Sequence, residues 1–368
     1  MTSYSTSTTS SQKEENEKLL DKNFTIIINK QLGKGGFGQI YLGRNLKENV
    51  GIAIKVEENG SRSHLYSEYE ILKSLQDGDG IPHIYKYREG HKHNYLIMEL
   101  LGKSIDKLFS ENKKNFSFKT IFQIGYQMIQ RIEFIHSNGY IHRDIKPGNF
   151  VIGRNENSKK IYIIDFGLSK RYLDKYTNKH IPYREGKGLT GTARYVSLFT
   201  HYGIEQSRRD DIEGIAYNLI YLAKGKLPWQ GVRTKNKKEK HKKIMESKIQ
   251  ISPEKLCEGL SGEFVSLLKY ARELEFEEKP DYKNIKKMFK NSITKIGSMD
   301  WEFDWNKNKE EDSKEEEKSE KSQKSKKSQK SKKSQKSKKS QKSQKSQKSQ
   351  KSQKSQKSQK PQKSEKDE

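Results

Sequence analysis

Cysteine is nearly absent from this sequence, because the chain of 368 residues contains a single one, Cys257. One thiol cannot form an intramolecular disulfide or a cysteine-based zinc site, which suits a reducing compartment. Long apolar runs are also lacking: the first twenty residues are rich in Ser and Thr, and no later segment approaches the length of a membrane span. We therefore expect no secretory signal and no membrane span, and a location in the cytoplasm, the nucleus or both.

Positive charge is in large excess, with 75 Lys and Arg against 48 Asp and Glu and a formal net charge of +27. Such a charge favours nucleic acids, anionic surfaces or acidic substrates as partners. Much of it lies in residues 307–368, a repetitive tail of Lys, Ser, Gln and Glu that has too little apolar surface to fold. The composition predicts a disordered leader over residues 1–22, one domain over residues 23–306 and a disordered tail over residues 307–368.

The first part of the predicted domain is rich in β-branched residues. Between residues 24 and 95 such runs alternate with glycine-containing turns, which predicts an antiparallel sheet; three of the runs are residues 24–29, 39–42 and 52–56. Residues 63–75 instead have apolar side chains at helical spacing and predict a single helix.

After Gly102 the pattern changes to long amphipathic helices, which include residues 118–137, 210–223 and 262–274. The expected fold class is therefore α+β. A small β-rich lobe with one helix should precede a larger, mainly helical lobe.

A glycine-rich segment, Gly33-Lys34-Gly35-Gly36-Phe37-Gly38, lies between two predicted strands. Glycines let the backbone approach phosphate oxygens and donate N–H groups to them. Dinucleotide-binding loops share this spacing, but there a helix follows the loop, whereas here a strand follows. The segment therefore predicts a loop over the phosphates of a nucleotide.

Lys55 ends the run Ile52-Ala53-Ile54-Lys55 on the next strand, from which its ammonium could hold the α and β phosphates. Glu68 on the single predicted helix is the candidate counter-ion that would orient it. Taken alone, either residue could equally be an exposed surface charge.

Two further segments supply the remaining chemistry: residues 141–150 contain His142-Arg143-Asp144, and residues 163–167 contain Asp165-Phe166-Gly167. Asp144 offers a carboxylate to orient a hydroxyl and accept its proton, and Lys146 offers a charge for the phosphoryl group. Asn149 and Asp165 offer hard oxygen ligands for Mg²⁺. The combination predicts phosphoryl transfer from ATP. Serine and cysteine nucleophiles have no comparable support, and a metal site remains the less favoured interpretation of the histidines, namely His91, His93, His136 and His142.

With these motifs the chain resembles the protein kinases, and other segments are similar to the casein kinase I family. Those segments are MELLG (98–102), HIPYRE (180–185), LTGTARY (189–195), GIEQSRRDD (203–211), LPWQG (227–231) and FDWN (303–306). The resemblance covers about residues 21–306 and implies a serine/threonine kinase of signal transduction that uses ATP and Mg²⁺. It also implies an adenine pocket with Met98 as gatekeeper and Glu99 to Leu101 as hinge, and nucleotide contacts from Ile40 and Ala53.

The chain departs from the family pattern at a few positions. Ser197-Leu198-Phe199 stands where the family has Ser-Ile-Asn, Gly148 where it usually has Asp or Glu, and Ala216 where glycine is common. None of these changes removes a charge that would touch ATP. They bear on the rigidity of the catalytic loop and on the level of activity.

The resemblance further implies a substrate site that reads acidic or already phosphorylated sequence. The cations of this chain that match such an anion site are Arg143, Lys170, Lys187, Arg194 and Lys240. A solvated helix face or a nuclear targeting signal is the alternative for the basic run that contains Lys240.

Two other functions are compatible with the composition. One is a catalytically weak pseudokinase scaffold, which the presence of the complete set of charged motif residues disfavours. The other is non-specific binding of nucleic acid or anionic surfaces through the Lys-rich tail, which lacks the interleaved aromatics of a specific binder. We expect a monomer.

Overall fold

The computed structural model describes residues 17–35, 38–60 and 64–306. The predicted disordered tail, most of the predicted leader, and Gly36 and Phe37 of the glycine loop lie outside this part. The chain separates into two units after Asp304, and the fold below is that of residues 17–304.

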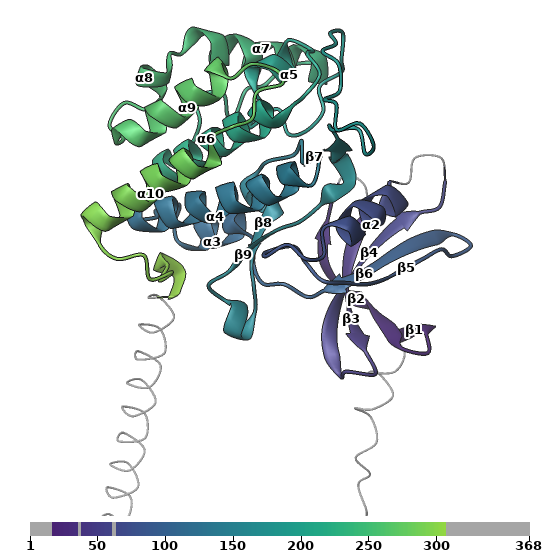
Figure 1. Ribbon diagram of the computed structural model, residues 1–368. Helices are drawn as coiled ribbons and strands as arrows, with labels where there is room; N and C mark the ends of the chain where they lie inside the picture. The colour runs from purple at the N-terminus through teal and green to yellow at the C-terminus, as the bar shows by residue number, and fades with distance from the viewer. Residues whose placement is uncertain (1–16, 36–37, 61–63, 307–368) are drawn as a thin grey trace, which may run out of the picture. The chain divides into compact units, whose positions relative to one another are not determined.

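The amino-terminal lobe is a six-stranded sheet with the strand order β1-β2-β3-β4-β6-β5 (Figure 1). Every neighbouring pair in it is antiparallel. In the described part of this lobe the one helix is α2 (Leu65–Ser74), as the sequence predicts. The strands are β1 (Glu17–Asp21), β2 (Phe24–Lys34), β3 (Gln39–Asn45), β4 (Val50–Glu58), β5 (Ile84–Arg88) and β6 (His93–Glu99).

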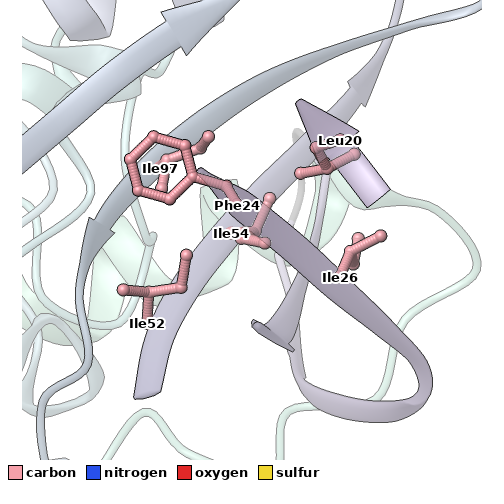
Figure 2. Packing of buried hydrophobic residues seen from close by; sticks show 6 residues of the cluster. All are labelled: Leu20, Phe24, Ile26, Ile52, Ile54 and Ile97. Atoms are coloured by element: carbon pink, nitrogen blue, oxygen red, sulfur yellow. The ribbon is translucent and has the colours of Figure 1, made fainter. Parts of the chain in front are cut away.

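One face of this sheet is closed by a cluster of aliphatic and aromatic side chains (Figure 2). Alternate residues of a strand point to the same face, so Ile52 and Ile54 of β4 both enter the cluster, and each is fully buried. Their neighbour Lys55 therefore points to the opposite face. The alternation in this one strand separates the apolar core of the lobe from its charged face.

The first strand corrects the predicted boundary of the leader. Residues 1–22 were expected to be disordered, but residues 17–21 form β1, which pairs with β2 from Glu17↔Ile27 to Asp21↔Phe24. The physical reason is Leu20, which is 8% exposed and packs in the core cluster (Figure 2). Asp21 closes the turn, because its Oδ1 accepts from the backbone N–H of Asn23 at 2.9 Å.

The carboxyl-terminal lobe is mainly helical (Figure 1). The central helices are α4 (Phe118–Ser137) and α6 (Arg208–Lys224), and α6 is buried along nearly its whole length. Ser117 caps α4 by accepting from the N–H of Thr120, and at the start of α6 Oδ2 of Asp210 accepts from the N–H of Ser207 at 2.7 Å. The others are α3 (Ile105–Glu111), α5 (Leu198–His201), α7 (Lys237–Gln250), α8 (Pro253–Leu256), α9 (Gly262–Glu273) and α10 (Tyr282–Ile296).

Two short ladders between the lobes carry the motif residues. Strand β7 (Tyr140–Ile141) pairs with β10 (Lys170–Arg171), and β8 (Phe150–Ile152) pairs with β9 (Ile161–Ile163). The turns η1 (Pro147–Asn149) and η3 (Phe166–Leu168) adjoin these strands, and η2 (Asn155–Asn157) lies in the loop between β8 and β9. The pairing places the segment after β7 beside the segment after β9.

These findings confirm the predicted α+β fold with a β-rich and a helical lobe. Helices α4, α6 and α9 match the predicted segments within two residues at each end. Within the described residues, none of the helices has both the length and the apolar composition needed to cross a membrane.

Candidate active site

Lys55 joins the two lobes. Its Nζ atom lies 2.6 Å from Oε2 of Glu68 on α2 and 2.8 Å from Oδ1 of Asp165 after β9. The predicted strand lysine, helix glutamate and metal-binding aspartate therefore meet at one point. Because Lys55 and Glu68 are buried, these hydrogen-bonded ion pairs are only weakly screened by solvent.

The pKa values within this cluster follow from burial and charge. Burial disfavours the ammonium of Lys55, but the carboxylates of Glu68 and Asp165 raise its pKa above the usual range. Burial also opposes ionisation of Asp165, yet the charge and hydrogen bond of Lys55 keep the pKa of Asp165 below normal. Burial raises the pKa of Glu68 against the attraction of Lys55. We treat the cluster as ionised, because the one ammonium has two carboxylate partners.

The carboxylate of Asp144, in the loop after β7, accepts hydrogen bonds from three side chains. Its Oδ2 accepts from Nζ of Lys146 at 2.5 Å and from Nδ2 of Asn149 at 3.1 Å. Its Oδ1 accepts from Oγ1 of Thr192 at 2.8 Å. Asp144 is 5% exposed, so its carboxylate is fixed in position and shielded from bulk water.

A second aspartate, Asp211 on α6, holds the backbone of this loop. Its two carboxylate oxygens accept from the N–H groups of His142 and Arg143 at 2.8 and 2.9 Å. Its Oδ2 also lies 2.8 Å from Nε2 of His136, whose Nδ1 lies 2.7 Å from the hydroxyl of Tyr282. Burial lowers the pKa of His136, so the ring is neutral, donates to Asp211 and accepts from Tyr282.

These contacts explain two of the histidines structurally. Both ring nitrogens of His136 are taken, and those of His142 lie 3.2 Å from the carbonyl of Ile164 and 3.3 Å from the N–H of Asp144. No group of three or more His, Cys, Asp or Glu side chains in the described part of the chain could hold a metal ion.

Two residues of this site have a strained backbone. Arg143 has φ 67° and Asp165 has φ 68°, both in the left-handed region that side-chain-bearing residues rarely adopt. Arg143 is held there by Asp211 and by its own Nε, which donates to the carbonyl of Leu168 at 2.6 Å. Such conformations persist where surrounding contacts fix them, as at functional sites.

Asn149 and Asp165 suit a magnesium ion that also binds phosphates. Asn149 uses its Nδ2 in hydrogen bonds to Asp144, and Lys55 occupies Oδ1 of Asp165. Among the described residues no donor binds the remaining oxygens, Oδ1 of Asn149 and Oδ2 of Asp165. Mg²⁺ in phosphate-binding sites takes one or two protein oxygens and completes its shell with phosphate and water, so these residues fit the ion.

The predicted nucleotide-contacting residues lie on neighbouring strands. Ile40 pairs with Lys55, and Ala53 pairs with Met98. Gly33 and Lys34 end β2, and the N–H of Gly35 donates to the carbonyl of Gly38 at 2.9 Å. A Cβ at Gly38 would lie 2.4 Å from the carbonyl oxygen of Val56, so only glycine fits there. Of the predicted hinge, Glu99 ends β6, with its N–H donating to the carbonyl of His83, and Leu101 follows.

Two of the predicted substrate cations, Lys170 and Lys187, pair with Glu205. Its Oε2 lies 3.0 Å from Nζ of Lys170 and 3.1 Å from Nζ of Lys187. Burial lowers the pKa of Arg143, and the charge of Glu205 acts in the opposite direction. The structure thus gathers Lys170 and Lys187 into one cluster with the carboxylate of Glu205, and Arg143 lies near enough for that charge to act on it.

The other two predicted cations lie elsewhere. The guanidinium of Arg194 lies 5.5 Å from the ring centroid of Tyr195 and 5.9 Å from that of Tyr221. Lys240 is exposed on α7. The positions of α7 that line the hollow beside Lys187 include Lys238, His241 and Lys242, and Lys240 is turned away from these by helical spacing. The residues of the expected anion site therefore do not form one group: Lys170 and Lys187 pair with Glu205, whereas Arg194 and Lys240 do not.

Sequence reasoning assigned no role to Thr192, Glu205 or Asp211, although all three lie in the segments that it singled out. An acidic residue in the first turn of a buried helix could have drawn attention to Asp211. No spacing rule connects Thr192 to Asp144, because that contact depends on the path of the chain between residues 171 and 197.

The positions that depart from the family pattern leave these contacts intact. Gly148 has only Lys146 Cε near a built Cβ, at 3.9 Å, and Ala216 is 1% exposed. The ring of Phe199 packs 3.5 Å from the guanidinium carbon of Arg209.

A family model described as "Protein kinase domain" matches residues 26–289. The match includes every motif residue of the site described above and well over half of the chain. Together with the two lobes and the residues that meet between them, it shows that this chain belongs to the protein kinase family.

Proposed function

We propose that this kinase transfers the γ-phosphate of ATP to serine and threonine hydroxyls in acidic or pre-phosphorylated proteins, as a kinase of the casein kinase I type. The observation that carries the proposal is the convergence of Lys55, Glu68 and Asp165 beside the Asp144 loop. Activity of protein kinases requires this lysine–glutamate pair and this aspartate in place together. A pseudokinase scaffold gives no reason for all of these contacts to be kept.

In this proposal each residue acts on charge or position. Lys55, oriented by Glu68, holds the nucleotide phosphates. Asp144 orients the substrate hydroxyl and takes its proton as the bond from oxygen to phosphorus forms and the bond to ADP breaks. Lys146 lies beside Asp144 and places positive charge near the transferred group. Bound Mg²⁺, held by Asn149 and Asp165, would neutralise charge on the phosphates.

The preference for anionic substrates rests on the family resemblance and on charge. Lys170 and Lys187 share a single carboxylate, Glu205, so with Arg143 the cluster keeps a net positive charge. A phosphate or carboxylate of a substrate could bind there with charge-assisted hydrogen bonds. Arg194 is a separate cation, because its guanidinium packs on tyrosine rings and forms no ion pair with the described residues.

The test is phosphorylation of matched peptides by the purified full chain with labelled ATP and Mg²⁺. We expect Ser and Thr peptides with a phosphoserine three residues upstream to react faster than unprimed ones, and tyrosine peptides to remain unlabelled. Lys55→Met is the inactive reference. Labelling with that variant equal to wild type, or no labelling of any peptide by wild type, would contradict the proposal.

The role of Arg194 in substrate recognition can be measured separately. Because it acts on the substrate anion, Arg194→Ala should lower kcat/KM for a primed peptide by about tenfold, the scale of one charge-assisted hydrogen bond, and leave the KM for ATP unchanged. Lys255→Ala is the control, since Lys255 is an exposed lysine that pairs with Glu258 and belongs to no predicted site. Equal losses on primed and unprimed peptides would show that Arg194 does not read the anion.

Location and assembly belong to the same proposal. We infer a cytoplasmic or nuclear kinase that acts as a monomer in signal transduction. Imaging of the tagged chain and light scattering of the purified protein test the two points. A stable dimer in solution would contradict the second.

A further inference from the structure

Three backbone carbonyls in one turn of the segment of residues 189–198 accept hydrogen bonds from buried side chains. Nζ of Lys248 donates to the carbonyl of Ala193 at 3.0 Å and to that of Val196 at 2.5 Å. Nε1 of Trp229 donates to the carbonyl of Arg194, between them, at 2.8 Å. The side chain of Arg194 is half-buried and packs on the rings of Tyr195 and Tyr221.

Lys248 is not an ordinary surface lysine. It lies on α7, whose other lysines are exposed, yet its side chain has 0% exposure. Burial lowers its pKa to about 7, with Glu213 acting in the opposite direction and Arg272 lowering it further. An unpaired ammonium is costly to bury. Here two carbonyls and the rings of Tyr217 and Trp229, at 4.6 and 5.3 Å, compensate it.

Helix α6 fixes the next part of the same segment. The carboxylate of Glu213 accepts from the N–H of Leu198 at 3.3 Å, from the hydroxyl of Tyr217 at 2.7 Å and from Nε of Arg272 at 3.3 Å. Arg272 also donates to the carbonyl of Lys248 at 3.5 Å. The anchors of this segment are therefore Glu213 of α6, Lys248 of α7 and Trp229, and Arg272 of α9 contacts Glu213 and Lys248 rather than the segment itself.

The residues whose carbonyls accept these hydrogen bonds adjoin Thr192 and include Arg194. Thr192, one residue before the first held carbonyl, donates to Asp144, and Arg194 lies between the two carbonyls that Lys248 binds. We propose that Lys248 is a positioning residue for the substrate: it fixes the backbone on both sides of Arg194 and so presents Arg194 to the anion of the incoming protein. This role rests on the proposed function, because it concerns the same substrate site.

The test compares Lys248→Met with wild type in the full chain. Methionine keeps the length of the side chain but donates no hydrogen bond. We expect kcat/KM for the primed peptide to fall by about tenfold, the KM for ATP to stay within about twofold, and the ratio of primed to unprimed rates to fall. In an Arg194→Ala background the same change should leave that ratio unaltered. An unchanged ratio in the wild-type background would overturn the proposal.

Lys224→Met is the matched control, because Lys224 also donates to a backbone carbonyl, at 2.8 Å, but that carbonyl belongs to Leu256, outside residues 189–198. It should leave the ratio unaltered. Trp229→Phe removes the donor to the carbonyl of Arg194 but keeps an aromatic ring beside Lys248, and it should lower the ratio in the same direction. It keeps the proposal testable if Lys248→Met does not fold, and a normal ratio in Trp229→Phe would then count against it.

Hydrogen–deuterium exchange separates this inference from the proposed function. Amides of residues 189–198 should exchange faster in Lys248→Met than in wild type, while α4 stays protected. If wild type phosphorylates no peptide, the proposed function fails. The exchange measurement then shows by itself whether Lys248 fixes the backbone of residues 189–198. Unchanged exchange in that segment would overturn the positioning role whatever the activity.

Discussion

Lys55 meets two carboxylates, so its ammonium links a strand and a helix of one lobe to the loop after β9 of the other. At the scale of single residues, the geometry of the site depends on such bridging charges. Asp211 bridges in the same way, because it binds two backbone amides of the catalytic loop and His136. Replacing Lys55 or Asp211 should therefore loosen the contact between elements that lie far apart in the sequence.

Asp165→Asn tests the charge that we assign to the metal site. The change keeps the shape of the side chain but removes the negative charge beside Lys55. We expect turnover to fall at least about a hundredfold, the scale of one lost electrostatic stabiliser. Steady-state kinetics with a primed peptide measures it. Near-normal turnover would refute the assignment, and Asp300→Asn, on the surface near the end of the lobe, is the control.

Asp210 should make stability depend on pH. Burial raises its pKa to about 7, against hydrogen bonds from Ser197 and the N–H of Ser207. Between about pH 4 and 7 the native state therefore holds a proton that the unfolded state has lost. The free energy of unfolding should fall as pH rises through this window, by about 1.4 kcal/mol for each unit between the two pKa values.

Chemical denaturation of wild type and Asp210→Asn at several pH values measures this effect. The stability of wild type relative to the variant should decrease from pH 4 to 7. Asp300 gives the opposite sign, because its hydrogen bond with Lys119 lowers its pKa to about 2, so its contribution is lost as pH falls. Parallel pH curves for wild type and Asp210→Asn would contradict the buried, protonated state.

At the scale of elements, β1 shows how one apolar residue decides whether a segment is ordered. Leu19 and Leu20 are adjacent, but strand alternation leaves Leu19 65% exposed and buries Leu20 to 8%. Composition alone assigned both to the leader, because Ser, Thr, Glu and Lys dominate its first residues. The pairing with β2 depends on a core that the leader itself does not contain.

The two leucines form a matched pair for experiment. Leu20→Ala should lower the free energy of unfolding by about 2 kcal/mol, the lower end for buried leucines, because a strand at the sheet edge can relax. Leu19→Ala should change it by less than about 0.5 kcal/mol. Urea denaturation of both variants measures the difference. Equal effects of the two changes would show that β1 does not pack as described.

Prediction from sequence succeeded where the period was long and regular. The predicted helix over residues 118–137 coincides with α4, and α9 differs by one residue. The two-residue strands β7 and β10 have no period to detect, since they exist through pairing with each other. Most residues of helix α7 are charged, and its buried residues are Ile244 and Lys248. The sequence therefore showed only a basic run there and no amphipathic helix.

For the molecule as a whole, the motifs predicted which chemical groups meet but not what else joins them. The meeting of Lys55, Glu68 and Asp165 follows from known roles of motif residues. Glu205 among the substrate cations and Thr192 on Asp144 depend on how a long segment folds back. Lys240 was grouped with those cations from the family resemblance and its charge, and helical spacing places it on another face of α7 than the residues beside Lys187.

Charge is distributed unevenly over the chain. The tail of residues 307–368 is rich in Lys, while an acidic stretch over residues 310–320 lies at its start. Unmodified Lys-Ser-Gln repeats are cationic, so the basic substrate site should repel them. Their serines also lack upstream acidic residues and should be poor substrates, whereas Ser313 and Ser319 in the acidic stretch should be better ones. We therefore expect the tail to bind anionic partners and to inhibit the kinase little.

Deletion of residues 307–368 tests this balance. Turnover on a short primed peptide should stay within about twofold of the full chain, because the tail is repelled from the site rather than bound to it. Retention on an anionic matrix should weaken, and in the full chain it should fall steeply with added salt, because each lysine that neutralises an anion releases a counterion. Peptide kinetics and salt elution are measured on the full chain and on the chain that lacks residues 307–368. A large activation on deletion, reversed by a phosphorylated tail peptide, would show that the tail inhibits the kinase instead.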